Sequence, residues 1–234
     1  MGIEIGAVMI PWYGLFIVLG IAAGAVLGYF LICANRMDYD DFIQTACFVG
    51  LGAMAGAKLL YLIVSWRSID FSRITDPEYL NALMGGGFVF YGGLIGGLTG
   101  LYLCGKILHI PVTDYARAAI PVIPLVHAFG RIGCAFAGCC YGVPYDGPGA
   151  VVYTESIAAP TGVPLFPVQA VEAAGNLLIT DVLCIYGEIC RRKGRKAKSL
   201  QLYLVLYAVF RFALEFARYD DSERGILMGL STSQ

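Results

Sequence analysis

Long apolar runs separated by short polar segments set the pattern of this chain. Six runs of about 20 residues cover residues 10–33, 42–65, 87–108, 115–136, 167–190 and 200–217. None has the alternating pattern of a barrel strand, so each predicts a helix that satisfies its own backbone groups inside a bilayer. The polar segments 35–41, 67–81 and 138–163 are predicted as linkers. The pattern therefore predicts an all-α integral membrane protein, a polytopic bundle of six spans in a single domain, residues 1–234.

The composition agrees with this prediction. The chain is 58% hydrophobic and 14% charged, with a mean hydropathy of +0.71, whereas a soluble domain carries roughly 25% charged residues. A net charge of −1 and the absence of a phosphate-binding glycine motif argue against nucleic acid and nucleotides as partners, and no cofactor is expected. No Lys or Arg precedes the first apolar run and no small-residue cleavage site follows it, so it is predicted as a span and not a signal peptide.

The positive charges predict the orientation. Segment 191–198 holds six Lys and Arg residues, which makes it cytoplasmic by the positive-inside rule and places the N-terminus outside. Polar side chains from five spans then lie towards the outer face: Trp12, Tyr13, Tyr91, His127, Arg131, Gln169, Glu172, Arg211, Glu215 and Arg218.

Charged residues within spans suggest a function, because each costs roughly 2.5–3.5 kcal/mol at the bilayer centre. Arg211 and Glu215 are four residues apart and can pair on one helical face. They either form a buried ion pair that fixes helix packing, or Arg211 and Arg131 present planar forks to an anion such as the phosphate diester of a phospholipid in the outer leaflet. His127 is either a hydrogen-bonded packing residue or a participant in the chemistry. Asp181 and Glu188 are both expected to pair with the basic segment.

Glycines cluster before and within the third run, at residues 85–87, 92–93 and 96–97. They predict either close helix packing or a broken segment that borders a cavity.

Three cysteines lie close together in the sequence: Cys134, Cys139 and Cys140. Nearby Arg131 would favour a thiolate. The cluster is compatible with structural thiols or a disulfide, with redox or soft-metal chemistry, or with a nucleophile. Its spacing fits no standard zinc pattern, so no metal ligand is assigned.

Several motifs occur in the order found in one known family. They are Pro11-Trp12-Tyr13-Gly14-Leu15, Tyr91-Gly92-Gly93-Leu94-Ile95-Gly96, Gly130-Arg131-Ile132-Gly133, Pro167-Val168-Gln169-Ala170-Val171-Glu172 and Arg211-Phe212-x-x-Glu215-Phe216-x-Arg218. The chain thereby resembles the prolipoprotein diacylglyceryl transferases. The resemblance implies a bacterial inner-membrane enzyme that moves a diacylglyceryl group from phosphatidylglycerol, or a similar anionic phospholipid, to a cysteine thiol of a prolipoprotein or related acceptor at the outer leaflet. Tyr13, Arg131, Arg211 and Glu215 would line the lipid site, and the two arginines would stabilise charge on the leaving glycerol phosphate.

The sequence departs from the family pattern at three positions. The family has histidine where this chain has Tyr91, asparagine at Cys134 and glutamate at Cys139. A tyrosine with a pKa near 10 is a poor base at neutral pH, which leaves His127 as a candidate replacement. The predicted catalytic residues are Arg131, Arg211, Tyr91, His127, Cys134 and Cys139; the predicted substrate-binding residues are Tyr13, Gly92, Gly93, Gln169, Glu172, Glu215 and Arg218.

Residues 229–234 resemble the lead-in to a seventh family span, so we expect either six spans or a truncated sequence. Two other functions are considered. A membrane thiol protein could use the three cysteines for redox or soft-metal handling. A small transporter fits less well, because the charges gather at one face and no inverted repeat is evident.

Overall fold

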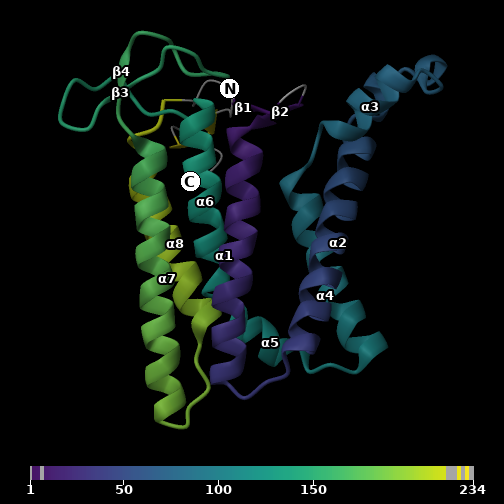
Figure 1. Ribbon diagram of the computed structural model, residues 1–234, viewed down its shortest axis with the longest axis vertical. Coiled ribbons are helices and arrows are strands. Elements are labelled where there is room, and N and C mark those ends of the chain that lie inside the picture. Colours follow the sequence, from purple (N-terminus) through teal and green to yellow (C-terminus); the bar gives the residue numbers. More distant parts are fainter. Residues whose placement is uncertain (1, 6–7, 220–225, 228–229, 232–234) are drawn as a thin grey trace. The chain divides into compact units, whose positions relative to one another are not determined.

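The computed structural model describes residues 2–5, 8–219, 226–227 and 230–231. Figure 1 shows that helices dominate it. In chain order they are α1 (Trp12–Ala34), α2 (Tyr39–Val64), α3 (Pro77–Gly85), α4 (Phe90–Leu108), α5 (Val112–Ala119), α6 (Val122–Ala137), α7 (Val168–Arg192) and α8 (Ser199–Glu215). Short 3₁₀ helices η1 (Trp66–Ser68) and η2 (Phe71–Arg73) follow α2. The strands form antiparallel pairs: β1 (Gly2–Ile5) with β2 (Val8–Pro11), β3 (Val151–Val152) with β4 (Pro164–Leu165), and β5 (Ile226–Leu227) with β6 (Leu230–Ser231).

These helices confirm the predicted all-α membrane architecture. Within the described residues, α1, α2 and α7 are each long and apolar enough to span a membrane, and the number rises to five if the bent pairs α3–α4 (75°) and α5–α6 (49°) each form one span. Each of the six apolar runs contains a helix, but six spans remain a prediction. The segment 229–234 lies outside the described residues except for Leu230 and Ser231.

The chain divides into two compact units, which are described separately. One unit comprises Met1–Asn35 and Arg117–Gln234, and the other comprises Arg36–Ala116.

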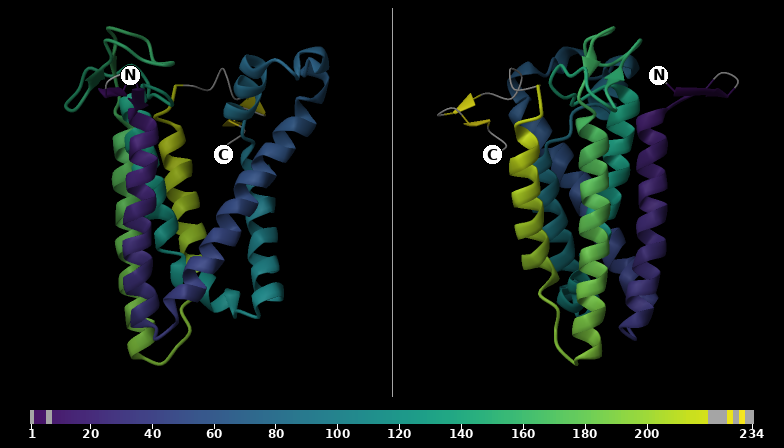
Figure 2. Two further views of the ribbon diagram at one scale, coloured as in Figure 1. Left: turned by 45° about the vertical axis from the view of Figure 1, so that its right-hand side comes forward. Right: turned by 90° about the vertical axis from the view of Figure 1, so that its left-hand side faces the viewer.

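In the first unit, α6 packs against α1 and α7, and α8 packs against α7, so that these helices run side by side (Figure 2). Small residues allow α1 to approach α6, since a Cβ on Gly24 would lie 2.8 Å from a methyl carbon of Val126. Helix α7 buries one face along its length, because its buried residues recur at three- and four-residue intervals. The part of this face near the start of α7 is polar. Further along the helix, Ile179 and Leu183 pack with Ile120 into an apolar cluster.

The linker between α6 and α7 covers the end of this unit where α6 ends and α7 begins (Figure 1). It contains the β3–β4 hairpin and pairs with the residues after α8, because Gly142 bridges Arg218 and the amide of Tyr219 donates to the carbonyl of Tyr141 at 3.3 Å. The end of α8 is thereby fixed beside the ends of α6 and α7.

In the second unit, α2 and α4 pack through facing glycines. A Cβ on Gly96 would lie 2.1 Å from the carbonyl oxygen of Gly52, and a Cβ on Gly92 would lie 2.4 Å from that of Gly56. Only glycine permits this backbone approach. The prediction of close helix packing is therefore correct for Gly92 and Gly96.

The glycine run before α4 breaks the helix, as the alternative reading predicted. Gly87 has φ +66°, and α3 and α4 meet at 75°. Lys58 stabilises the break, because its Nζ donates to the carbonyls of Leu83 at 2.5 Å and Gly86 at 2.6 Å at the end of α3.

The prediction of segment 67–81 as a plain linker was wrong at its end. Helix α3 begins at Pro77, and the side chain of Asp76 caps it by accepting from the amide of Glu78 at 3.0 Å. Proline at the first position of a helix after an aspartate cap is favoured, so Asp76 and Pro77 begin a helix within the segment.

Candidate functional site

A buried carboxylate on α7 is the centre of the site. The Glu172 side chain is 2% exposed, and its Oε2 forms an ion pair with Nη2 of Arg131 on α6. Nη1 of Arg218, after α8, lies 3.5 Å from the same oxygen. Nε2 of His127 lies 3.7 Å from Oε1. Residues from α6, α7 and the end of α8 thus converge on one side chain.

A second ion pair lies within α8. Nη1 of Arg211 pairs with Oε2 of Glu215, and their side chains are 14% and 3% exposed. The predicted pairing of these residues, four positions apart on one helical face, is confirmed.

These residues gather several guanidinium groups in one buried region. We call Arg131, Glu172, Arg211, Glu215 and Arg218 the arginine cluster. The described side chains of the cluster supply three guanidinium groups and two carboxylates. Buried guanidinium groups in such a setting can bind an anion.

Arg131 has an edge available for such an anion. It is 8% exposed, and its Nε has no hydrogen-bond partner among the described residues. A guanidinium carries five N–H donors in a planar fork, which matches phosphate oxygens.

An aromatic ring stands beside the candidate histidine. The ring centroid of Tyr207, on α8, lies 5.6 Å from that of His127. Tyr207 was not predicted as a site residue, because a tyrosine in an apolar helix usually serves packing. Its only sequence signal is its position four residues before Arg211, on the same helical face.

The three cysteines form a thiol cluster next to Arg131. Cys134 lies in the last turn of α6, and Cys139 and Cys140 follow the end of that helix at Gly138, which has φ +66°. The three sulfurs lie within 4.8 Å of one another. All eight cysteines of the chain fall within the described residues and are free thiols.

Gln169, predicted to bind substrate, holds this loop in place. Its Nε2 donates to the carbonyl of Cys139 at 2.8 Å and to the hydroxyl of Tyr153 at 3.3 Å. The hydroxyl of Tyr153 in turn donates to the carbonyl of Ala135 at 3.0 Å, and burial raises the pKa of Tyr153. Tyr153 was not predicted, since nothing in its local sequence distinguishes it.

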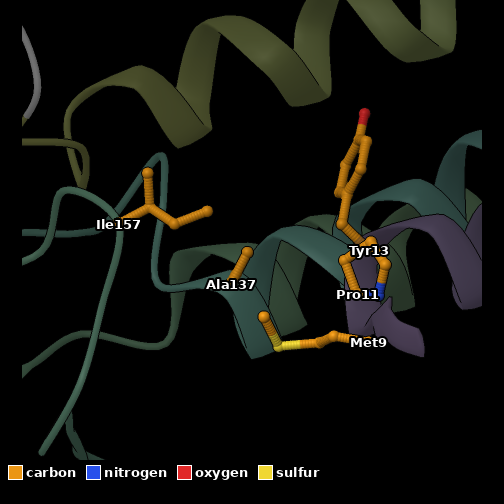
Figure 3. A pocket seen from close by; sticks show the side chains of 5 residues that line it. All are labelled: Met9, Pro11, Tyr13, Ala137 and Ile157. Carbon is orange, nitrogen blue, oxygen red and sulfur yellow. The ribbon is translucent and has the colours of Figure 1, made fainter. Parts of the chain in front are cut away.

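A small cavity of about 320 Å³ opens beside the thiol cluster. Figure 3 shows its lining from β2, the start of α1, the end of α6 and the linker: Met9, Pro11, Tyr13, Ala137 and Ile157. The hydroxyl of Tyr13 points away from the other four side chains (Figure 3). Tyr13 is 46% exposed, and its predicted place in the lipid site stays a prediction.

The remaining predicted residues lie in the second unit. Tyr91 stands in the first turn of α4 and is 68% exposed. Gly92 packs against α2, whereas Gly93 lies 3.5 Å from the Cβ of Ala57. Their roles in catalysis and binding remain predictions.

Glu188 forms ion pairs with Arg191 at 2.7 Å and Arg192 at 2.6 Å near the end of α7. Its predicted pairing with the basic segment is confirmed.

Comparison with known proteins is consistent along the whole chain. The family model described as prolipoprotein diacylglyceryl transferase matches residues 1–234. A phosphatidylglycerol–prolipoprotein diacylglyceryl transferase of Clostridium tetani is 38% identical over 232 residues, covering 99% of this chain and 89% of that protein. A second transferase of this name, from Clostridium perfringens, is 34% identical over 99% of this chain and 87% of its own length. A third, from Methylococcus capsulatus, is 32% identical over 97% of this chain and 84% of its own length.

The chain belongs to the prolipoprotein diacylglyceryl transferase family. The resemblance predicted from the motifs is confirmed, and the family and its named members indicate a diacylglyceryl transferase. Nothing in these comparisons favours a redox function. In this family member the arginine cluster has a thiol cluster as its neighbour.

Proposed function

We propose that this chain transfers the diacylglyceryl group of phosphatidylglycerol to the cysteine thiol of a prolipoprotein at the outer leaflet of the bacterial inner membrane. The observation that carries the proposal is Arg131, which is 8% exposed and whose Nε has no hydrogen-bond partner among the described residues. A lipid phosphate diester carries oxygens that can accept a hydrogen bond from this guanidinium. The names of the relatives supply the lipid and the acceptor class.

In the reaction, the acceptor sulfur forms a bond to the terminal glyceryl carbon of the diacylglycerol unit. The bond between that carbon and the phosphate oxygen breaks, and its electron pair leaves with glycerol phosphate. Arg131 and Arg211 stabilise the charge that grows on the departing phosphate, which is worth most in a site that excludes water. The acceptor thiol loses its proton as it attacks, and His127, held 3.7 Å from Glu172, is the group of the first unit best placed to receive it.

Leaflet and orientation rest on the basic segment after α7 and on the position of the cluster. Arg191 and Arg192 lie at the end of α7, and Glu172 lies near its start. If the basic end is cytoplasmic, the arginine cluster belongs to the outer half of the bilayer.

The test is a transfer assay with purified protein, glyceryl-labelled phosphatidylglycerol and a peptide that carries the acceptor cysteine. The informative variant is Arg131→Lys, because it keeps a positive charge beside Glu172 and removes the planar fork. Loss of one well-placed donor to a developing oxyanion costs about 100-fold or more in rate, so we expect a loss of that size. Arg192→Lys is the matched control, since Arg192 pairs at the other end of the bundle with an exposed side chain.

Two results would count against the proposal. One is the absence of labelled peptide and of released glycerol phosphate with the native protein. The other is an Arg131→Lys variant that transfers at the rate of the control.

A further inference from the structure

The thiol cluster is the feature of the first unit that the transfer reaction leaves unexplained. Cys134, Cys139 and Cys140 bring their sulfurs within 4.8 Å of one another, and Cys134 is buried while the other two are half-buried. All three are free thiols, and thiolates are ligands that select soft cations.

The loop that carries these thiols is held mainly by hydrogen bonds of the backbone and of Gln169. The amide of Ile157 donates to the carbonyl of Ala137 at 3.0 Å, and that of Ala159 donates to Gly138 at 2.9 Å. Gln169 holds the carbonyl of Cys139 at 2.8 Å. Cys140 adopts a left-handed conformation, φ 54°, which is uncommon for a residue with a side chain. The backbone therefore fixes the three side chains close together before any partner arrives.

We propose that the thiol cluster binds a thiophilic d¹⁰ cation, Zn²⁺ in the first instance, through three thiolates and leaves a fourth coordination position for the acceptor thiol. Thiolate is the ligand that selects Zn²⁺ and Cu⁺ over hard cations. Zn–S bonds of about 2.3 Å in a tetrahedral site place the sulfurs about 3.8 Å apart. The sulfurs lie within 4.8 Å of one another, so they need to approach by about 1 Å at most to reach that distance.

The surrounding charges fit such a complex. Zn²⁺ with three thiolates carries one negative charge, and the guanidinium groups of Arg131 and Arg218 both act electrostatically on Cys140. Arg131 also acts on Cys134. A hard cation without thiolates would be repelled by the same two arginines, so the site selects for ligands that bring negative charge with the metal.

The fourth position faces an accessible mouth. A zinc ion held by three protein ligands keeps its fourth position for water or substrate. Ala137, which lies between Cys134 and Cys139 in the sequence, lines the cavity together with Tyr13, so we place the fourth position on the side of that cavity. The identity of the fourth ligand rests on the proposed transferase function: the acceptor is a thiol, and a thiol that binds zinc is deprotonated. Its proton passes to His127, as in the proposed reaction, and the bound sulfur keeps a lone pair for the glyceryl carbon. The metal would thus provide a thiolate without a histidine at position 91.

The experiment uses Co²⁺ as a spectroscopic probe on the reduced, detergent-solubilised full chain. We expect one Co²⁺ per chain, with a thiolate-to-cobalt charge-transfer band and the strong visible bands of a tetrahedral ion, both displaced by Zn²⁺. The triple variant Cys134→Ser, Cys139→Ser, Cys140→Ser should lose these bands. The control Cys33→Ser should keep them, because Cys33 is an exposed cysteine on α1, outside the thiol cluster. A peptide with the acceptor cysteine should strengthen the charge-transfer band, and the same peptide with serine should not.

X-ray absorption on the native zinc form gives an answer that does not depend on variants that fold. Three sulfur neighbours, rising to four with the cysteine peptide, are expected. Any of three results would overturn the metal site: a first shell of nitrogen and oxygen around the metal, Co²⁺ bands that survive in a folded triple variant, or a fully reduced protein that binds no metal. An unchanged shell on addition of the cysteine peptide would overturn the role of the fourth position.

The outcome for the metal is separable from that for the reaction. Full transfer by the triple variant or after chelation would reject the metal's role and leave the transferase function standing. Absence of transfer by zinc-loaded native protein that passes the absorption test would instead reject the transferase function.

Discussion

Replacing Glu172 by glutamine is predicted to cost more stability than any single substitution of an exposed charge in this chain. The side chain is 2% exposed and has two guanidinium groups on one oxygen, those of Arg131 and Arg218. Glutamine keeps the shape of the side chain and removes only its charge. The buried guanidinium group of Arg131 then lacks the carboxylate with which it pairs.

The size of the effect follows from that burial. Removing one partner of a buried ion pair costs about 3–5 kcal/mol, because the remaining charge is left uncompensated. A cost of this size lowers the folding equilibrium constant by a factor of about 100 to several thousand. Glu188→Gln is a matched control on the same helix, since its ion pairs with Arg191 and Arg192 are solvent-exposed. Exposed pairs contribute little to stability, and no resolvable change is expected there.

The assay measures the unfolding of both variants in the same detergent, by heating and by denaturant titration. If Glu172→Gln unfolds at the same midpoint as Glu188→Gln, the inferred ion pairing of Glu172 with Arg131 and Arg218 is wrong. A double-mutant cycle with Arg131→Met sharpens the test, because a true pair gives a double variant that is less destabilised than the sum of the two single changes.

Two further predictions concern the second unit and the thiol cluster. Gly52→Ala should weaken the packing of α2 on α4 by about 1–3 kcal/mol, because the new Cβ would lie 2.4 Å from the carbonyl oxygen of Gly96. The control Gly50→Ala adds a Cβ that meets nothing within 4 Å and should be neutral or slightly stabilising. Equal unfolding midpoints of the two variants would refute the packing. In metal-free protein, hydrogen bonds from the neighbouring thiols and the charges of nearby arginines lower the pKa of Cys140. Its thiolate therefore persists to lower pH. Alkylation of Cys140 by iodoacetamide, measured by peptide mass spectrometry, should have a midpoint below the pKa of about 8.5 of an ordinary thiol. A midpoint at or above that pH would contradict the charge environment.

The helices of this fold follow from sequence because bilayer length and apolar composition dictate them directly. Runs such as 10–33 and 167–190 predict α1 and α7 to within two residues at each end. The break before α4 could not be chosen from the sequence, because glycine serves both close packing and chain reversal. Gly96 and Gly87 show that neighbouring glycines do both. The distinction depends on what faces each backbone, which is a tertiary property.

The polar residues of the site were predicted by type and depth, but their partners were not. Arg211 and Glu215 pair within one helix, and that contact follows from a spacing of four. The contacts of Glu172 with Arg131 and Arg218 join different helices, and they depend on how each helix is rotated about its axis. Gln169 binds the backbone of the cysteine loop, and its predicted role in substrate binding stays a prediction. Its sequence context gives no sign of that loop, because the loop lies 30 residues earlier in the chain.

The sequence left two readings of the arginines, a buried ion pair or an anion site, and the geometry makes them compatible. Arg131 pairs through Nη2 with Glu172 and leaves Nε without a hydrogen-bond partner among the described residues, so one guanidinium has donors for both purposes. An incoming phosphate need not break the ion pair, because a guanidinium has five N–H donors. Lysine cannot divide its contacts in this way, since its ammonium is a single point charge. Arg131→Lys should therefore retain much of the stability that Glu172→Gln loses and still lose transfer. If Arg131→Lys loses stability together with transfer, the separation of these two functions of Arg131 is refuted.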